Sequence, residues 1–475
     1  MRPPVLPSMR PSNSSLASAA LGALGALVPM LWLWGFTVDD ALISARVAHQ
    51  LATGHGYRFN ASGPIVDAVT PLGWAPLLVP FAGRDVWSTM LAAKWLGVIA
   101  WLLGAGYLGT RLGALGRRSL VVGLVALLTC VPLAAWAVAG METGLVVALT
   151  TLALGSGNGA RLALGLATGL RPELAPWALM LTLSDAVLAE GTAANRMRRA
   201  AVGLAFAFGP FVLTALIRQW LFGAAYPLSL LAKPSDLSSG LRYALGGLLL
   251  CGPPWLMVAG PTWRRVSPRG RVLGLAALVH VAAIVVAGGD WMTLYRLFVP
   301  VLPSMILVGA ELARHAPRFA TGARLFFALG ASAVLGFSLG PSARAVGYQR
   351  RELIDGARPL LAGAERVATL DVGWVGATTS ATVIDLAGVT DPSVARLTGG
   401  HTSKRLPDSF LEARQVDALV LLAEVPHLGS LDETHFLRTV EQRVPLLASA
   451  ERFEVVGFVP LIGTRQSYVI ARRER

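Results

Sequence analysis

Residues 17–40 read ASAALGALGALVPMLWLWGFTVDD, and this stretch decides the fold class. The segment 17–36 carries no charge and is long enough for a helix to cross the hydrocarbon core of a bilayer, which takes about 20 residues. Asp39 and Asp40 follow at once, and carboxylates are costly inside hydrocarbon. The stretch therefore predicts a membrane span that ends at the water boundary, beside Asp39 and Asp40.

The rest of the chain repeats this pattern. Of its 475 residues, 54% are hydrophobic and 14% are charged, whereas soluble domains carry about 25% charged residues. Further apolar blocks that are candidate spans lie at 88–110, 119–139, 143–157, 162–170, 174–189, 200–221, 243–260, 272–288, 297–313 and 323–340. The blocks 143–157 and 162–170 are short for a span, and the prolines in 70–82 favour an interfacial segment there. We predict an α-helical polytopic membrane protein with about eleven transmembrane helices, the first of which is retained and not cleaved as a signal peptide.

The basic residues indicate how these helices are oriented. The net charge is +14, and arginines gather in the breaks between apolar blocks, at Arg111/Arg117/Arg118, Arg161, Arg196/Arg198/Arg199, Arg264/Arg265/Arg269/Arg271 and Arg314/Arg318/Arg324. Basic loops stay in the cytoplasm, and eleven spans with a cytoplasmic N-terminus place all of these clusters there. The charge therefore indicates topology and no nucleic-acid partner. We expect a multi-pass protein of the inner or plasma membrane whose residues after about 344 are extracytoplasmic.

The composition changes at about residue 345. Charges become frequent, and short β-type runs appear at 367–371, 382–385, 418–422, 453–458 and 467–471, with helical patterns near 405–415 and 432–447. This is the pattern of a soluble α/β domain of about 130 residues, a normal domain size. We therefore expect a transmembrane domain at 1–344, with its first extracytoplasmic loop at 37–87, and an extracytoplasmic α/β domain at 345–475.

The first loop opens with the carboxylate pair on an amphipathic pattern. Apolar residues recur at 43, 47 and 51, and polar residues at 46, 49, 50 and 53, which predicts a helix lying on the bilayer with a polar face. One aspartate of the pair can cap this helix while the other is free for catalysis. His55, between two glycines, is either a surface turn residue or a ligand of a substrate hydroxyl.

Several motifs in a fixed order carry a resemblance that covers nearly the whole chain. They are Asp39-Asp40-x-x-Ile43-Ser44-x-Arg46 with Gly54-His55-Gly56, Asn60 and Thr70-x-x-x-Trp74; Gly140-Met141-Glu142-Thr143; Arg171-Pro172-Glu173; Ala232-Lys233; Gly288-Gly289-Asp290-Trp291 with Tyr295-Arg296; and Asp385-Leu386-Ala387-Gly388-x-Thr390-Asp391-Pro392. Together they resemble a bacterial family of GT-C polytopic membrane glycosyltransferases, which includes terminal arabinofuranosyltransferases of the cell wall.

The resemblance implies a polyprenyl-phosphate-linked sugar as donor and a glycan or other cell-envelope molecule as acceptor. Asp39 or Asp40 is then the general base on the acceptor hydroxyl, and the sequence does not rank the two. Residues expected to stabilise the departing lipid phosphate are Arg46, Arg171, Lys233 and Arg296. The other expected substrate-binding residues are His55, Glu142, Glu173, Asp290 and Tyr295. No cofactor is expected, and a divalent metal is compatible with the scheme but not required.

These residues also have purely structural interpretations. Arg171 and Glu173 can form a salt bridge between short helices, Lys233 and Arg296 can be snorkelling anchors, and Tyr295 fits an aromatic belt at the membrane surface. For the whole protein, the alternative is a transporter or flippase of lipid-linked glycans, which would also have many spans and a charged cavity. Such a protein needs neither a carboxylate pair after the first span nor a large external domain, and it often has internal repeats, which this sequence lacks.

Overall fold

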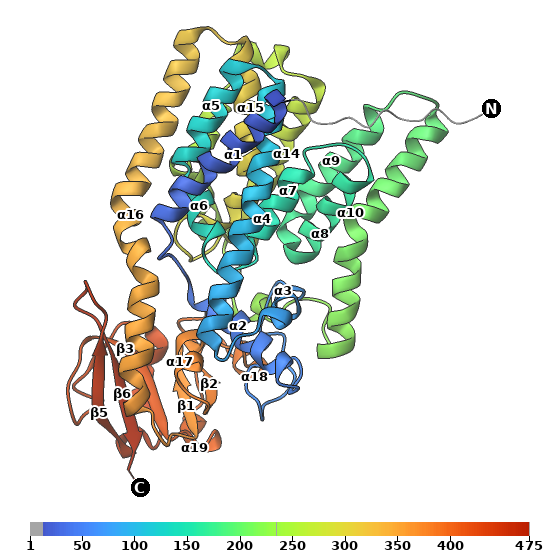
Figure 1. Cartoon of the computed structure of the whole chain (residues 1–475). Coiled ribbons are helices and arrows are strands. Elements are labelled where there is room, and N and C mark those ends of the chain that lie inside the picture. The colour runs from blue at the N-terminus through green and yellow to red at the C-terminus, as the bar shows by residue number, and fades with distance from the viewer. Residues whose placement is uncertain (1–12, 234, 475) are drawn as a thin grey trace.

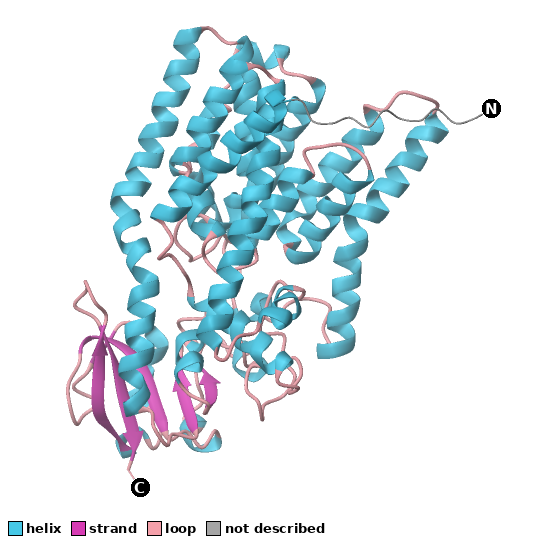
Figure 2. Cartoon of the chain, in the orientation of Figure 1, coloured by secondary structure: helices cyan, strands magenta, loops and turns pink. Residues whose placement is uncertain are grey.

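The computed structural model describes residues 13–233 and 235–474, so the N-terminal segment 1–12 lies outside it. The described residues form a tall bundle of helices with a smaller sheet domain at one end (Figures 1 and 2). Helix α16 (Arg318–Leu360) has 43 residues, runs along the bundle and continues to the sheet domain. Residue 345, the expected domain boundary, lies inside α16, so one continuous helix joins the two parts.

Six helical segments of the described chain are long and apolar enough to cross a membrane. They are α1 (Asn13–Trp32), α4 (Val86–Ala114), α10 (Ala193–Phe222), α14 (Pro268–Ala287), η4 (Arg296–Val301) continued by α15 (Leu302–His315), and α16. A seventh span results if α5 (Arg117–Thr129) and α6 (Val131–Ala137), which meet at a 60° bend, cross together. The bend follows from Pro132, which cannot donate an N–H to the preceding turn and so favours the start of a new helix.

The remaining apolar blocks form helices too short to cross a bilayer unaided. They are α7 (Thr143–Leu152), α8 (Asn158–Leu170), α9 (Ala175–Val187) and α12 (Leu237–Leu250). A helix rises about 1.5 Å per residue, so these helices reach about 15–21 Å against a hydrocarbon core of about 30 Å. Every block predicted as a span therefore contains a helix, whereas the number of eleven crossings stays a prediction.

The sheet of the C-terminal domain has six strands. They are β1 (Arg366–Thr369), β2 (Thr382–Asp385), β3 (Ala418–Val425), β4 (His435–Phe436), β5 (Phe453–Pro460) and β6 (Ser467–Arg473). The order is β2-β1-β3-β6-β5, with β4 paired to β3. Strand β1 is parallel to β2 and β3, whereas β6 is antiparallel to β3 and β5. Helix α17 (Val372–Thr378) makes the connection from β1 to the parallel β2.

The sequence predicted this domain well in its strands and poorly in its helices. All five predicted strands are confirmed, and β4 was missed because two residues carry no alternation. The helical patterns at 405–415 and 432–447 shorten to α19 (Phe410–Ala413) and α20 (Thr439–Arg443). The other short helices of the chain are α11 (Ser229–Ala232), α13 (Pro253–Leu256), α18 (Pro392–Ala395), η2 (Pro172–Leu174), η3 (Pro261–Arg265), η5 (Val444–Leu446) and η6 (Ala450–Arg452).

The first loop fills the junction between the bundle and the sheet domain. It forms α2 (Asp39–Ala52), α3 (Trp74–Leu78) and η1 (Val79–Phe81), which lie together beside the sheet domain in Figure 1. Helix α2 forms as predicted, but its polar face does not lie open to water. Arg46 is only 4% exposed, because α17 of the sheet domain packs on α2. The sheet domain thus covers the predicted polar face at Arg46, whereas the interfacial position of α2 stays a prediction.

Candidate active site

A cavity of about 400 Å³ lies where the helix bundle meets the first loop and the sheet domain. Each wall comes from the end of an element: the start of α2, the loop before α3, the turn from α8 into η2, the segment around α11, and the stretch from the end of α14 into η4. Val389 of the sheet domain adds one further contact. The polar residues among those lining it are Asp40, Ser44, Thr70, Arg171, Glu173, Ser229, Lys233, Asp290 and Arg296.

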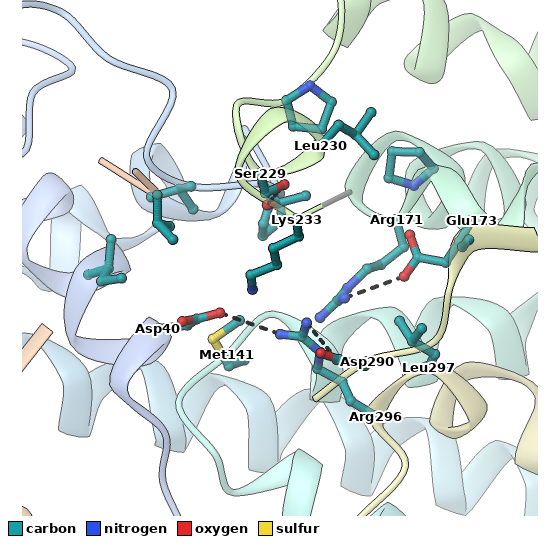
Figure 3. A pocket seen from close by; sticks show the side chains of 18 of the residues that line it. Asp40, Met141, Arg171, Glu173, Ser229, Leu230, Lys233, Asp290, Arg296 and Leu297 are labelled. Carbon is teal, nitrogen blue, oxygen red and sulfur yellow. Dashed lines mark hydrogen bonds and ion pairs between the residues drawn. The ribbon is translucent and has the colours of Figure 1, made fainter. Parts of the chain in front are cut away.

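Arg296 links two carboxylates across the floor of this cavity. Its Nε and Nη2 each lie 2.8 Å from Oδ2 of Asp290, and its Nη1 lies 3.7 Å from Oδ2 of Asp40 (Figure 3). Burial works to raise the pKa of Asp290, but Arg296 and Lys233 outweigh it and lower that pKa below its usual value. Asp290 therefore holds Arg296 through short hydrogen bonds. Asp40 has only the contact of 3.7 Å with Arg296, and it lines the cavity.

A second cation, Arg171, is held by acidic neighbours. It forms ion pairs with Glu142 and with Glu173, the latter at 3.3 Å, and Nη2 also donates to the hydroxyl of Thr143 at 3.3 Å. Glu142 is fully buried and lies behind the cavity wall. The salt bridge between Arg171 and Glu173, one of the structural interpretations of the sequence, is therefore present. Both residues also line the cavity, so the salt bridge does not exclude a role in binding.

Lys233 is the least restrained of the cations. No carboxylate within the described residues forms an ion pair with it, and its Nζ lies 5.4 Å from the ring centre of Trp291. In Figure 3 its side chain extends towards Asp40 and Arg296. Trp291 also contacts the ring of His401 from the sheet domain, at 5.3 Å between centroids. The ammonium group of Lys233 has no ion-pair partner among the described residues. It can therefore bind an anionic ligand through charge-assisted hydrogen bonds.

Asp39, the neighbour of Asp40, does not reach the cavity. Its carboxylate accepts hydrogen bonds from the backbone N–H groups of Gly373, at 2.7 Å, and Trp374, at 2.9 Å. These groups belong to the first turn of α17, so Asp39 caps a helix of the sheet domain and not its own helix. Burial and the nearby carboxylate of Asp371 raise the pKa of Asp39 to about 7, against the opposing effects of Arg350 and the two N–H donors.

Arg46 also lies outside the cavity, at the other end of α17. Its guanidinium donates to the carbonyl oxygens of Gly376, of Thr379 at 3.1 Å and of Ala381 at 3.1 Å. Its Nε donates to the carbonyl of Phe59 at 2.8 Å. The donors of Arg46 are thus used on backbone carbonyls and on the side-chain oxygen of Asn60, which removes Arg46 from the set expected to contact lipid phosphate. Helix α2 therefore holds α17 with the carboxyl group of Asp39 at its N-terminus and the guanidinium of Arg46 at its C-terminus.

Two more expected site residues are placed elsewhere. His55 lies in an exposed turn, where its Nδ1 is 2.9 Å from the hydroxyl of Thr53. This position agrees with its interpretation as a surface turn residue. Tyr295 has a left-handed backbone with φ of 50°, and its ring packs 5.4 Å from that of Tyr243 outside the cavity lining. Of the expected residues, the cavity therefore brings together Asp40, Arg171, Glu173, Lys233, Asp290 and Arg296.

The cavity also contains neutral polar groups that were not singled out as site residues. The hydroxyls of Thr70 and Ser229 lie 2.8 Å apart, and both residues line the cavity together with Ser44. Such hydroxyls suit hydrogen bonding to a polyhydroxylated ligand. Ser229 carries no signal in the sequence, because a lone serine before Lys233 is ordinary loop composition. In residues 13–233 and 235–474, no group of three or more His, Cys, Asp or Glu side chains is arranged to hold a metal ion.

Comparison with known proteins places this cavity in a known fold. A family model described as a domain of unknown function (DUF8728) matches residues 350–470, and no curated protein matches the chain. Two crystal structures of ArnT from Cupriavidus metallidurans, bound to undecaprenyl phosphate and in the apo state, are similar, with TM-scores of 0.55 and 0.54. Each is 16% identical, and the match covers 97% of this chain and 98% of ArnT. At this identity the likeness shows the fold alone: the chain shares with ArnT an architecture of apolar helices and a C-terminal sheet region.

Proposed function

We propose that this protein is a glycosyltransferase that moves a sugar from a polyprenyl-phosphate-linked donor to a hydroxyl of a cell-envelope acceptor. The observation that carries the proposal is the cavity in which Asp40 faces Lys233 and Arg296 at the end of the apolar helices. ArnT, which shares the fold, is a lipid-phosphate-linked glycosyltransferase, and one of its structures holds undecaprenyl phosphate. The motifs in the sequence support the same class of donor.

The cavity suits a ligand with a lipid tail and an anionic head. Lys233 and Arg296 offer the head a free ammonium and part of a guanidinium, and Arg171 lines the same cavity. Leu230 lines the same cavity and is 61% exposed, which leaves an apolar path out towards the bilayer. A polyprenyl chain would follow this path and bring its phosphate to the cations.

The proposed reaction uses the residues of this chain and needs no cofactor. Asp40 accepts the proton of the acceptor hydroxyl as its oxygen bonds to the anomeric carbon of the sugar. The bond between that carbon and the phosphate oxygen breaks, and its electron pair stays on the phosphate. Lys233 and Arg296 stabilise the charge that develops there. The products are the glycosylated acceptor and polyprenyl phosphate, and a divalent metal is compatible with this scheme but not required.

We also propose on which side of the membrane the cavity lies and which substrates it takes. We place the cavity and the sheet domain on the extracytoplasmic side, because the arginine clusters lie at the other ends of the helices. The sheet domain would cover the mouth of the cavity and help bind the acceptor glycan. Polyprenyl-phosphate arabinose is the first donor to test, since the motifs resemble those of terminal arabinofuranosyltransferases.

The test is turnover in detergent, where no transport can occur. Purified protein is mixed with a radiolabelled polyprenyl-phosphate sugar and an acceptor glycan, and we expect labelled acceptor together with free polyprenyl phosphate. The matched control is Asp40→Asn, which should bind donor without transferring sugar. Donor binding without turnover in the unmodified protein, across a panel of donors and acceptors, would favour the alternative of a transporter or flippase.

A further inference from the structure

A second cavity lies at the opposite ends of the helices that build the first one. It measures about 400 Å³ and is lined by the loop 154–157 and by Arg111, Arg161, Asp185, Leu188, Ala189, Arg199 and Arg269. We call it the arginine pocket. An adjoining hollow of about 420 Å³ shares Arg161 and Arg199 and adds Asn158, Asn195, Arg198 and Val202.

The positions of the lining residues along their helices show that the two cavities face opposite ways. Helix α8 carries Arg161 in its first turn and leads into Arg171 of the active-site cavity at its other end. Helix α14 carries Arg269 in its first turn and is followed by Asp290. Helix α9 begins beside Glu173 and has Asp185 in its last turn. A helix of 20 residues such as α14 spans about 30 Å, so the two cavities lie on opposite faces of the bundle.

The charges of the arginine pocket are not balanced by the protein. Arg269 forms an ion pair with Asp185, the one carboxylate among the lining residues. Arg161 donates to the side-chain oxygen of Asn158 at 3.3 Å. Arg111 and Arg199 form no ion pair with any carboxylate of the described chain. Guiding the helices across a membrane needs only basic loops, whereas here four guanidinium groups from different segments meet in one hollow. Like charges gathered in this way repel unless an anion lies between them.

The rim of the pocket is apolar and open. Leu188 lines the pocket and is 48% exposed, and its neighbour Val187 is 71% exposed. Met197, on the first turns of α10, is 73% exposed. Exposed apolar side chains at the ends of membrane helices contact lipid acyl chains. The pocket thus joins a surface for acyl chains to a hollow for an anion.

We propose that the arginine pocket binds the phosphate headgroup of an anionic phospholipid on the face of the membrane opposite the active site. Guanidinium groups bind phosphate oxygens through paired, charge-assisted hydrogen bonds, and basic pockets between membrane helices suit such headgroups. Arg111 and Arg199 supply the free donors, and Arg269 is held in place by Asp185. Free inorganic phosphate has the same head chemistry but gains nothing from the apolar rim. This proposal does not depend on the glycosyltransferase reaction.

The test compares lipids on the full-length protein. Purified protein is reconstituted in vesicles of phosphatidylcholine with or without phosphatidylglycerol, extracted in mild detergent, and its retained lipid is counted by native mass spectrometry. We expect retained phosphatidylglycerol on the unmodified protein and about tenfold less on Arg111→Gln/Arg199→Gln. Neither arginine has a carboxylate partner, so the double variant strands no acidic group, and its thermal unfolding checks that it is folded.

The matched control is Arg264→Gln/Arg265→Gln, which removes two exposed arginines at the same end of the bundle outside the pocket. It should retain phosphatidylglycerol like the unmodified protein. Equal loss in both double variants would overturn the proposal in favour of general surface attraction. Displacement of the lipid by inorganic phosphate at equal concentration would overturn it in favour of a soluble anion. Full retention by Arg111→Gln/Arg199→Gln would overturn it outright.

Discussion

Two adjacent carboxylates have different surroundings in this protein. Consecutive residues on a helix point about 100° apart, so Asp39 turns to α17 while Asp40 turns to the active-site cavity. The sequence predicted that the pair would divide its roles but did not rank its members. The reason is physical: the partners of Asp39 are backbone N–H groups 334 and 335 residues further along the chain, and backbone groups leave no mark on sequence.

The first prediction is an asymmetric result for the pair. Asp40→Asn keeps the size of the side chain and removes its proton-accepting strength, so transfer should fall by about 100- to 10,000-fold. Asp39→Asn should keep most of the activity, because Asn also caps helices well. Single-turnover transfer by both variants, with donor binding measured separately, checks this. Equal activity of the two variants would remove Asp40 from the role of base.

The second prediction concerns the pH dependence of stability. The folded-state pKa of Asp39 is raised to about 7, above its ordinary value of 3.8, so the folded protein holds an extra proton between these values. The stability contributed by this proton is complete below about pH 4 and is lost as the pH rises through about 7. Asp39→Asn cannot titrate, so its unfolding temperature relative to the unmodified protein should increase from about pH 5 to about pH 8. A difference that stays constant with pH would contradict this assignment.

The third prediction concerns Lys233, whose ammonium has no ion-pair partner among the described residues. Lys233→Gln should weaken use of the lipid-phosphate donor about tenfold or more, with little change in the acceptor dependence, because one charge-assisted contact contributes about 1.5–3 kcal/mol. Arg242→Gln, at an exposed position near the start of α12, is the control for surface charge. Donor kinetics that Lys233→Gln leaves unchanged would assign Lys233 to snorkelling.

At the scale of elements, the sequence predicted which segments are helices better than how they end. The block 119–139 looks like one span, yet it breaks at Cys130 into α5 and α6. Proline is often tolerated inside membrane helices, so Pro132 alone does not announce a break. The blocks 143–157 and 162–170 are short for a span, and the helices within them, α7 and α8, are only 10 and 13 residues long. Arg171, which lines the active-site cavity, follows directly after α8.

The fourth prediction tests the grip of α2 on α17. Arg46→Ala removes hydrogen bonds to carbonyls at the end of α17 and leaves those buried oxygens unpaired, which should cost about 3 kcal/mol or more. We expect a lower unfolding temperature and faster proteolysis of the sheet domain. His55→Ala, in an exposed turn of the same loop, should leave both measurements unchanged. Unaltered protease resistance in Arg46→Ala would mean that other contacts dock the sheet domain.

For the molecule overall, the demands of the bilayer allow much of the architecture to be predicted from the sequence. Long apolar blocks are required by the membrane, and alternation reveals strands in the sheet domain. The number of crossings is harder to predict. Six or seven segments of the described chain are long and apolar enough to cross a membrane, whereas the positions of the arginines favour eleven crossings. Short helices gain their place from packing against neighbours, which composition does not show.

The fifth prediction concerns this topology, that is, the side of the membrane on which each loop lies. An alkaline phosphatase reporter, active only outside the cytoplasm, is fused after Ala200 or after the C-terminal Arg475. We expect activity at Arg475 and none at Ala200, because basic loops as a rule stay in the cytoplasm. Activity at Ala200 would reverse the helices that follow α9 and would contradict the eleven-span arrangement.

The clamp of α2 on α17 also affects how such a protein can be recombined. Asp39 and Arg46 come from the first loop, whereas the helix they hold comes from the far end of the chain. A chimera that exchanges only the sheet domain with that of a relative would set a foreign helix between a carboxyl group and a guanidinium that are positioned for α17. Exchanges that carry α2 and the sheet domain together keep the joint intact. The two segments should therefore be treated as a single graft, and substitutions in one should be accompanied by substitutions in the other.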